Sequence, residues 1–166
     1  MARYNRISKE KRMRPNFFVF CEGETEVAYV THLRSKYRLP IQIIPKKSDS
    51  NISCRYINNC KKEYVTTDRD RTFLMYDLDV AGILEHLKCI PEATLLVSSP
   101  CIELWFLLHC ADCSAELNQS SCVKKYQAFS EHYTKGKLNV KDYLNLTEGE
   151  DRAIDRAKRL TSPRNP

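Results

Sequence analysis

The sequence predicts an α/β protein in which a four-stranded parallel sheet is flanked by helices and followed by a helical C-terminal extension. Two observations support this fold class. Short apolar runs alternate along the chain with stretches of helical periodicity, in the order βαβαβαβα, which favours parallel strands joined by right-handed crossovers. The first run, at 16–22, is almost continuously apolar, as is typical of a strand buried on both faces.

Each element of this unit has its own signal. The strand at 16–22 stops at Gly23. The next segment is expected to be a helix at 24–36, because Val27, Val30 and Leu33 form an apolar stripe at helical spacing. This helix is expected to end before Pro40. The elements expected next are a strand at 41–44, a helix at 52–65, a strand at 72–76, a helix at 81–89 and a strand at 93–97.

The C-terminal half is expected to be helical. Ser99 is a favourable N-cap residue and Pro100 suits the first helical position, so the next helix is expected to begin there. Weaker helical patterns follow at 121–133, 142–146 and 150–160, with a turn at 135–137. No internal repeat or long linker divides the chain.

Charge is distributed unevenly along the 166 residues, a length that suits one domain. Residues 1–14 hold six Lys and Arg against one Glu, whereas the remaining 152 residues hold 21 basic and 20 acidic groups. We therefore expect a flexible basic arm at 1–15 and a single domain at 16–166. Basic side chains release counterions from phosphates, so Arg12 and Arg14 are candidate nucleic-acid contacts; a solubilising tail is the alternative.

Composition excludes several classes of protein. Hydrophobic residues make up 42% and charged residues 29%, which excludes disordered and collagen-like chains. The strongest apolar run, 102–108, is far shorter than the roughly 20 residues of a membrane span. The charged N-terminus has no apolar signal region. We therefore expect a cytoplasmic protein that does not enter a membrane.

The eight cysteines are expected to be reduced in such a compartment. Those inside predicted elements, Cys21, Cys54, Cys60 and Cys89, are expected to be small buried hydrophobes. A zinc site around Cys110 and Cys113, with His109 and Cys122 nearby, is an alternative, but it lacks a second matched cysteine pair.

Three carboxylates follow two of the predicted strands. Glu22 ends the first strand, and Asp77 and Asp79 follow the third. If these strands are neighbours, the three side chains meet at the carboxyl edge of the sheet, where α/β proteins bind ligands. Oxygen ligands suit Mg²⁺ or Mn²⁺. An acidic first helical turn around Glu24 and a capped turn at 77–79 are the simpler alternatives, and the conjunction of both motifs favours a metal site.

Glu103 is a fourth candidate. It lies just after the fourth strand in a helical turn that is apolar on nearly every side. A carboxylate there costs several kcal/mol of desolvation unless it is paired or binds a metal. A buried salt bridge or a partner for the helix N-terminus is the alternative.

Three motifs together resemble the RloB-like family. They are Phe-Val-Phe-Cys-Glu-Gly-Glu-Thr-Glu at 18–26, Tyr-Asp-Leu-Asp at 76–79, and Ser-Pro-Cys-Ile-Glu-Leu-Trp-Phe-Leu-Leu-His at 99–109. The similarity runs from about residue 16 to residue 160, with Ser99 where the family pattern has Asn. The resemblance implies a Toprim-type fold, the catalytic fold of topoisomerases, bacterial primases and OLD-type nucleases.

The resemblance also implies an activity and its residues. RloB-like proteins are typically encoded beside an RloA-type ATPase in bacterial antiphage defence, and a metal-dependent phosphodiesterase or a degenerate relative is expected. By position, Glu22 matches the Toprim glutamate, Asp77 and Asp79 match the paired metal-binding aspartates, and Glu103 matches the carboxylate after the fourth strand. These four are the expected catalytic residues and ligands of Mg²⁺ or Mn²⁺.

We therefore expect a nuclease that hydrolyses DNA or RNA, tRNA included. No tyrosine nucleophile is assigned, because Tyr76 is expected in the core and Tyr29 is merely close in sequence. Lys135 and Lys137 are candidate phosphate contacts, with surface solvation as the alternative. His109 is expected to be a core histidine rather than a general base.

A non-catalytic protein is the rival interpretation. Such a module would dock on the ATPase and bind nucleic acid through its basic arm. We also expect that the protein forms a homodimer.

Overall fold

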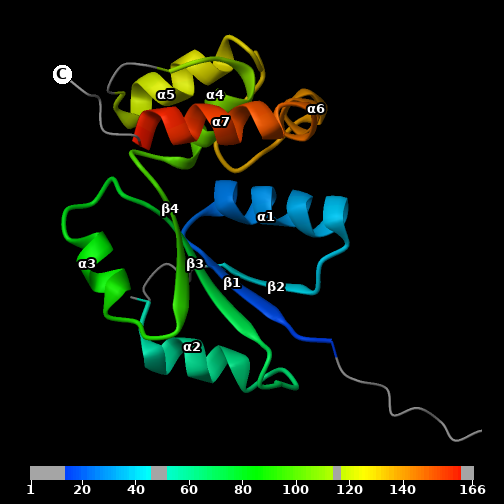
Figure 1. Ribbon diagram of the computed structural model, residues 1–166, viewed down its shortest axis with the longest axis vertical. Coiled ribbons are helices and arrows are strands. Elements are labelled where there is room, and N and C mark those ends of the chain that lie inside the picture. Colours follow the sequence, from blue (N-terminus) through cyan, green and yellow to red (C-terminus); the bar gives the residue numbers. More distant parts are fainter. Residues whose placement is uncertain (1–13, 46–51, 114–116, 162–166) are drawn as a thin grey trace, which may run out of the picture.

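The computed structural model describes residues 14–45, 52–113 and 117–161. Four strands form one parallel sheet in the order β2-β1-β3-β4 (Figure 1). They are β1 (Phe17–Cys21), β2 (Ile41–Pro45), β3 (Arg71–Asp77) and β4 (Ala93–Ser98). The predicted parallel sheet is therefore confirmed, and so is the adjacency of the first and third strands.

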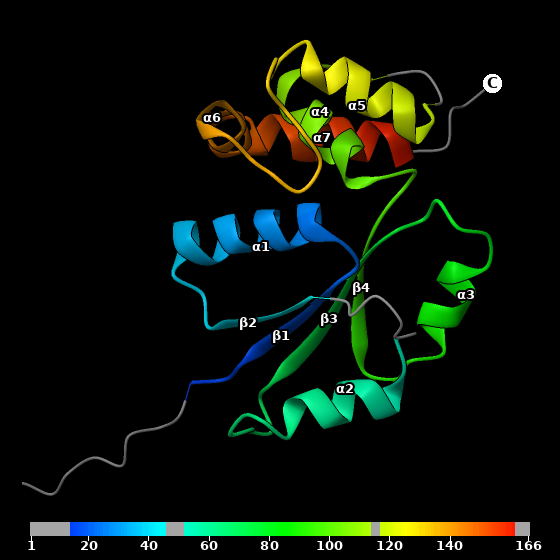
Figure 2. The same cartoon turned by 180° about the vertical axis from the view of Figure 1, so that it is seen from behind.

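Three helices pack against the sheet. Helix α1 (Glu24–Tyr37) covers β1 and β2 on one face, while α2 (Cys54–Lys61) and α3 (Ile83–Lys88) lie on the other face (Figures 1 and 2). Alternate residues of β1 serve the two faces: Phe18 and Phe20 pack toward α2 and α3, and Val19 packs toward α1. The first strand is thus buried on both faces, as its apolar sequence predicts.

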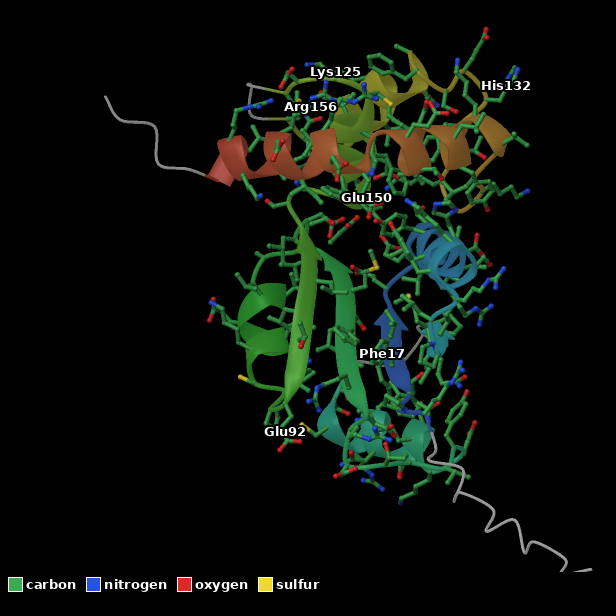
Figure 3. All side chains as sticks on the ribbon, turned by 45° about the vertical axis from the view of Figure 1, so that its right-hand side comes forward. Phe17, Glu92, Lys125, His132, Glu150 and Arg156 are labelled. Atoms are coloured by element: carbon green, nitrogen blue, oxygen red, sulfur yellow. The ribbon has the colours of Figure 1, made fainter. Side chains whose placement is uncertain are left out.

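Four further helices form a layer beyond the carboxyl ends of the strands (Figures 1 and 2). They are α4 (Ile102–Cys110), α5 (Gln119–Gln127), α6 (Val140–Glu148) and α7 (Glu150–Thr161). Helix α4 is the centre of this layer and packs against the other three. Figure 3 shows Glu150 between α7 and α1, where it accepts a hydrogen bond from Lys36 at 2.7 Å. The helical C-terminal extension is confirmed.

Several element boundaries differ from the prediction. Helix α4 begins at Ile102 with Cys101 as its N-cap residue, so Ser99 is not the cap; Ser99 and Pro100 precede the helix and are joined by a cis peptide bond. The helices expected at 52–65 and 121–133 end early, because the chain turns at 61–64 and again at 128–133, where Tyr133 enters the core.

The cysteine prediction is partly wrong. Cys21 is buried and Cys60 is half-buried, but Cys54 and Cys89 are exposed. Both exposed thiols lie at helix ends, Cys54 as the first residue of α2 and Cys89 as the C-cap of α3. A cysteine within a helical pattern is buried only when it lies on the apolar face, and these two do not.

The β3 and β4 side of one sheet face is only partly covered by the described residues. On the face that α1 covers at β1 and β2, an apolar groove of about 980 Å³ extends over β3 and β4. Leu96 of β4 stands 41% exposed there. The groove is lined by Phe17, Val19, Phe73, Met75 and Leu96 of the sheet, by Tyr29, Val30 and Leu33 of α1, by Leu104, Trp105 and Leu108 of α4, and by Ala157 and Leu160 of α7.

In the part of the chain that the structure describes, no helix combines the length and the apolar character that crossing a bilayer requires.

Candidate active site

Six carboxylates converge on one pocket at the carboxyl ends of β1 and β3. The pocket has a volume of about 340 Å³, and its lining includes Gly23, Thr25, Ile102, Gln119, Lys135, Gly136 and the six acids Glu22, Glu24, Glu26, Asp77, Asp79 and Glu103. All four acids predicted from the sequence are among them. We call this hollow the carboxylate pocket.

The strand-end carboxylates are held by backbone amides of neighbouring elements. Glu22 follows β1, and its Oε2 accepts a hydrogen bond of 2.9 Å from the backbone N–H of Asp77. The Oδ1 of Asp77 in turn accepts one of 2.9 Å from the N–H of Ile102, the first residue of α4. Asp77 therefore satisfies an otherwise unpaired donor at the N-terminus of α4, the capping role that the sequence assigned to Ser99.

The carboxylates in this pocket disfavour one another's charge. Burial, reinforced by the charges of Glu26 and Glu103, raises the pKa of Asp77 to about 8, although the amide of Ile102 opposes the shift. Burial also raises the pKa of Glu26, with smaller contributions from Glu22 and Glu103, against the opposing backbone hydrogen bonds. A cation placed here would relieve both the desolvation and the repulsion.

Glu103 carries a buried oxygen that lacks a hydrogen-bond partner among the described residues. The residue is fully buried, and its Oε1 accepts a hydrogen bond of 2.8 Å from the hydroxyl of Tyr133. The ammonium of Lys135 lies 3.8 Å from the same oxygen. The other oxygen, Oε2, has no hydrogen-bond partner among the described residues. An unpaired buried carboxylate oxygen is costly, so this atom points to a ligand.

A hairpin from the helical layer brings Lys135 to the pocket. Gly136 has a φ of +79°, and its N–H donates to Oγ1 of Thr25 at 2.9 Å. A Cβ at Gly136 would lie 2.7 Å from Oε2 of Glu24. Only glycine fits both this left-handed conformation and this close approach to α1. The hairpin thus holds Lys135 at the pocket. Among the described residues that line the pocket, Lys135 is the one with a basic side chain.

Asp79 lies at the outer rim. It is exposed, and its Oδ2 accepts a hydrogen bond of 3.2 Å from Nε2 of Gln119, the first residue of α5. The rim therefore joins the end of β3 to the helical layer.

The donor set suits a divalent ion, although its side chains are turned to other partners. Within residues 14–45, 52–113 and 117–161, no three His, Cys, Asp or Glu side chains are gathered closely enough to ligate one ion. The donors are nevertheless all oxygens, two of the acids have raised pKa values, and Glu103 Oε2 is unpaired. This chemistry fits Mg²⁺ or Mn²⁺, with rotation of the Glu22 and Asp77 carboxylates from their present amide partners.

Several other predicted residues lie away from this pocket. Arg14 is exposed and precedes β1, at the opposite end of the strand from Glu22, and Arg12 lies outside the described residues. Lys137 is exposed and does not line the pocket. His109 is buried with its Nδ1 2.9 Å from the carbonyl oxygen of Trp105, and burial lowers its pKa, so it is a core histidine.

The core position expected for Tyr76 is confirmed, and sequence reasoning assigned no specific role to Glu26, which lines the pocket, or to Tyr133, which contacts a pocket carboxylate. Tyr76 is buried in the core against α2 and α3, and Tyr29 accepts a hydrogen bond from Trp105. Glu26 was predicted only as part of an acidic helical turn; it does accept the N–H of Gly23, yet it is also buried beside the pocket. Tyr133 gave no signal, because its role depends on a contact 30 residues away in sequence.

Comparison with known proteins gives one informative result. The family model described as RloB-like protein matches residues 17–166. Neither the curated proteins nor the solved structures contain a match, so the Toprim-type assignment stays a prediction. The match includes the carboxylate pocket and nearly the whole chain, and the protein therefore belongs to the RloB-like family.

Proposed function

We propose that this protein is a phosphodiesterase that hydrolyses nucleic acid with Mg²⁺ or Mn²⁺, as an effector of bacterial antiphage defence beside an RloA-type ATPase. The observation that carries the proposal is the carboxylate pocket, in which several buried acids and an unpaired oxygen of Glu103 lie at the ligand-binding edge of a parallel sheet. Family membership and the three sequence motifs support it.

The chain's own groups divide the work. Glu22, Asp77 and Asp79 would hold the ion, and Glu103, which lines the same pocket, would flank it. A bound divalent ion supplies a Lewis acid that activates water and stabilises charge developing on a phosphate. Tyr133 fixes the orientation of Glu103 through its hydroxyl. The hairpin seated on Thr25 holds Lys135 at the pocket, where its charge attracts a polyanion.

Hydrolysis is favoured over attack by a tyrosine. Among the described residues, Tyr133 is the tyrosine whose hydroxyl donates a hydrogen bond to a pocket carboxylate, and its side chain is buried. Burial and the charge of Glu103 raise the pKa of its hydroxyl, so it stays protonated and acts as a hydrogen-bond donor. A water molecule is then the nucleophile.

The test is cleavage of plasmid DNA, single-stranded DNA and total tRNA with Mg²⁺, Mn²⁺ or EDTA, with and without the ATPase. We expect metal-dependent cleavage that falls by about 10²–10³-fold in Glu22→Gln and Asp77→Asn, the scale of losing a group that stabilises transition-state charge. Glu63→Gln, at an exposed carboxylate after α2, serves as the matched control and should cleave like the wild type. Equal activity of Glu22→Gln and the wild type would overturn the proposal.

A non-catalytic role beside the ATPase is the second candidate. The observation that favours it is that no three metal-ligating side chains are gathered in the described residues and that Lys135 already contributes a cation. In that case Glu22→Gln would leave both nucleic-acid binding and toxicity in cells intact. Inactivity of the wild type on every substrate with the ATPase present would support this role.

A further inference from the structure

We propose that Lys135 supplies the second positive charge of the carboxylate pocket, so that the site takes one divalent ion rather than two. The inference rests on the proposed function and deepens it, because the motifs alone leave one-metal and two-metal hydrolysis equally open. Three features of the described residues support it: where the ammonium lies, how firmly its loop is held, and how charge is distributed around it.

The ammonium lies beside the acid that a second ion would use. Glu22 and Asp77 are joined at the ends of β1 and β3, whereas Glu103 comes from α4. Lys135 Nζ is 3.8 Å from Oε1 of Glu103. The lysine therefore stands on the Glu103 side of the pocket and leaves the strand-end carboxylates for a metal ion.

The loop that carries Lys135 is anchored on both sides of it. The hydroxyl of Tyr133, which is 1% exposed, donates a hydrogen bond to the same Glu103 oxygen. Gly136 is hydrogen-bonded to Thr25 and fits against Glu24 without room for a side chain. A surface lysine that contacted only solvent would need neither the Tyr133 contact nor the Gly136 contact. These contacts fix the lysine backbone at the pocket while its side chain stays 49% exposed at the opening.

Repulsion from the Lys135 ammonium then disfavours a second metal ion at Glu103. The pocket gathers six carboxylates and this single described basic side chain. A second divalent ion bound to Glu103 would lie within a few ångströms of the ammonium, and like charges at that separation repel several-fold more strongly in a protein than in bulk water. The ammonium also presents its donors at the opening, where a phosphate group of the substrate would enter, and lysine binds phosphate as a point charge.

Mn²⁺ titration followed by electron paramagnetic resonance tests this without measuring cleavage. We expect the wild type to bind one Mn²⁺ per chain. Lys135→Met should bind Mn²⁺ about tenfold more tightly, because a repelling charge a few ångströms away is removed. Lys135→Arg should restore the wild-type affinity. Lys137→Met is the matched control, since Lys137 lies in the same hairpin but outside the pocket, and its Mn²⁺ affinity should equal the wild type's. Thermal melting of each variant confirms that it is folded.

The outcomes separate this inference from the proposed function. Two Mn²⁺ ions per wild-type chain, or an unchanged affinity in Lys135→Met, would overturn the role of Lys135 while leaving a metal-dependent site in place. Absence of Mn²⁺ binding, or binding that Glu22→Gln does not weaken, would overturn the proposed function and this inference together.

Discussion

Two hollows, the carboxylate pocket and the apolar groove, lie on two sides of α4, and they differ in the kind of side chain that each leaves without a suitable partner. The carboxylate pocket touches Ile102 and Glu103 in the first turn of the helix, and the apolar groove touches Leu104, Trp105 and Leu108. Among the described residues, Oε2 of Glu103 in the pocket is buried without a hydrogen-bond partner, whereas Leu96 in the groove is an apolar side chain left 41% exposed. Both depart from what folding alone favours, and such departures mark regions kept for function. They differ in the stability changes that mutations should cause.

The largest effect is expected from a residue that supports both hollows. Phe106 of α4 is fully buried, and its ring centroid lies 5.6 Å from that of Tyr29, which lines the groove, and 6.2 Å from that of Tyr133, which holds Glu103. Phe106→Ala should lower the free energy of unfolding by about 3–5 kcal/mol, because it opens a cavity at the centre of the helical layer. Urea denaturation measures the change. A loss below about 1 kcal/mol would show that the two hollows do not depend on a shared core.

A smaller loss is expected from Gly136, on the pocket side. Gly136→Ala combines a left-handed backbone with a Cβ that would lie 2.9 Å from Cβ of Glu24. Gly82→Ala is the matched control, because Gly82 has a φ of +81° and nothing within 4 Å of the added atom. The left-handed conformation costs alanine about 1 kcal/mol at either position, and we expect about 1 kcal/mol more at Gly136. Equal losses in denaturant titrations would mean that the hairpin does not press against α1.

Substitution of Glu103 should raise the free energy of unfolding, whereas the two preceding substitutions should lower it. Glu103→Gln keeps an acceptor for Tyr133 and replaces the unpaired oxygen with an amide that can donate toward neighbouring carboxylates. In EDTA we expect a gain of about 1 kcal/mol, since the desolvated charge is removed, which corresponds to roughly 2–4 °C in Tm for a chain of this size. Glu131→Gln, at an exposed acid, should melt like the wild type. A lower Tm for Glu103→Gln would indicate that Lys135 compensates the charge fully.

The contrast between the two hollows also shows where sequence reasoning succeeds. The order of elements and the strand ends at Glu22 and Asp77 could be predicted, because apolar runs and their terminating residues are local patterns. The cap of α4 could not, because its donor is satisfied by Asp77 from a different strand, 25 residues away. Likewise, Tyr133 enters the site through a long-range contact. The groove could not be predicted, because the apolar sequence of β4 does not indicate which face of the strand a helix covers.

The smallest effect is expected within the groove, and it tests whether that face is open. Leu96 and Leu74 lie on opposite faces of neighbouring strands, Leu96 41% exposed above the groove and Leu74 fully buried against α2 and α3. Leu74→Ala should cost about 2–5 kcal/mol, whereas Leu96→Ala should change the free energy of unfolding by no more than about 0.5 kcal/mol. Urea denaturation at two protein concentrations compares them. A comparable loss for Leu96→Ala that grows with protein concentration would mean that a second copy covers the groove, in agreement with the expected homodimer. A comparable loss that is independent of concentration would mean that the chain itself covers this face.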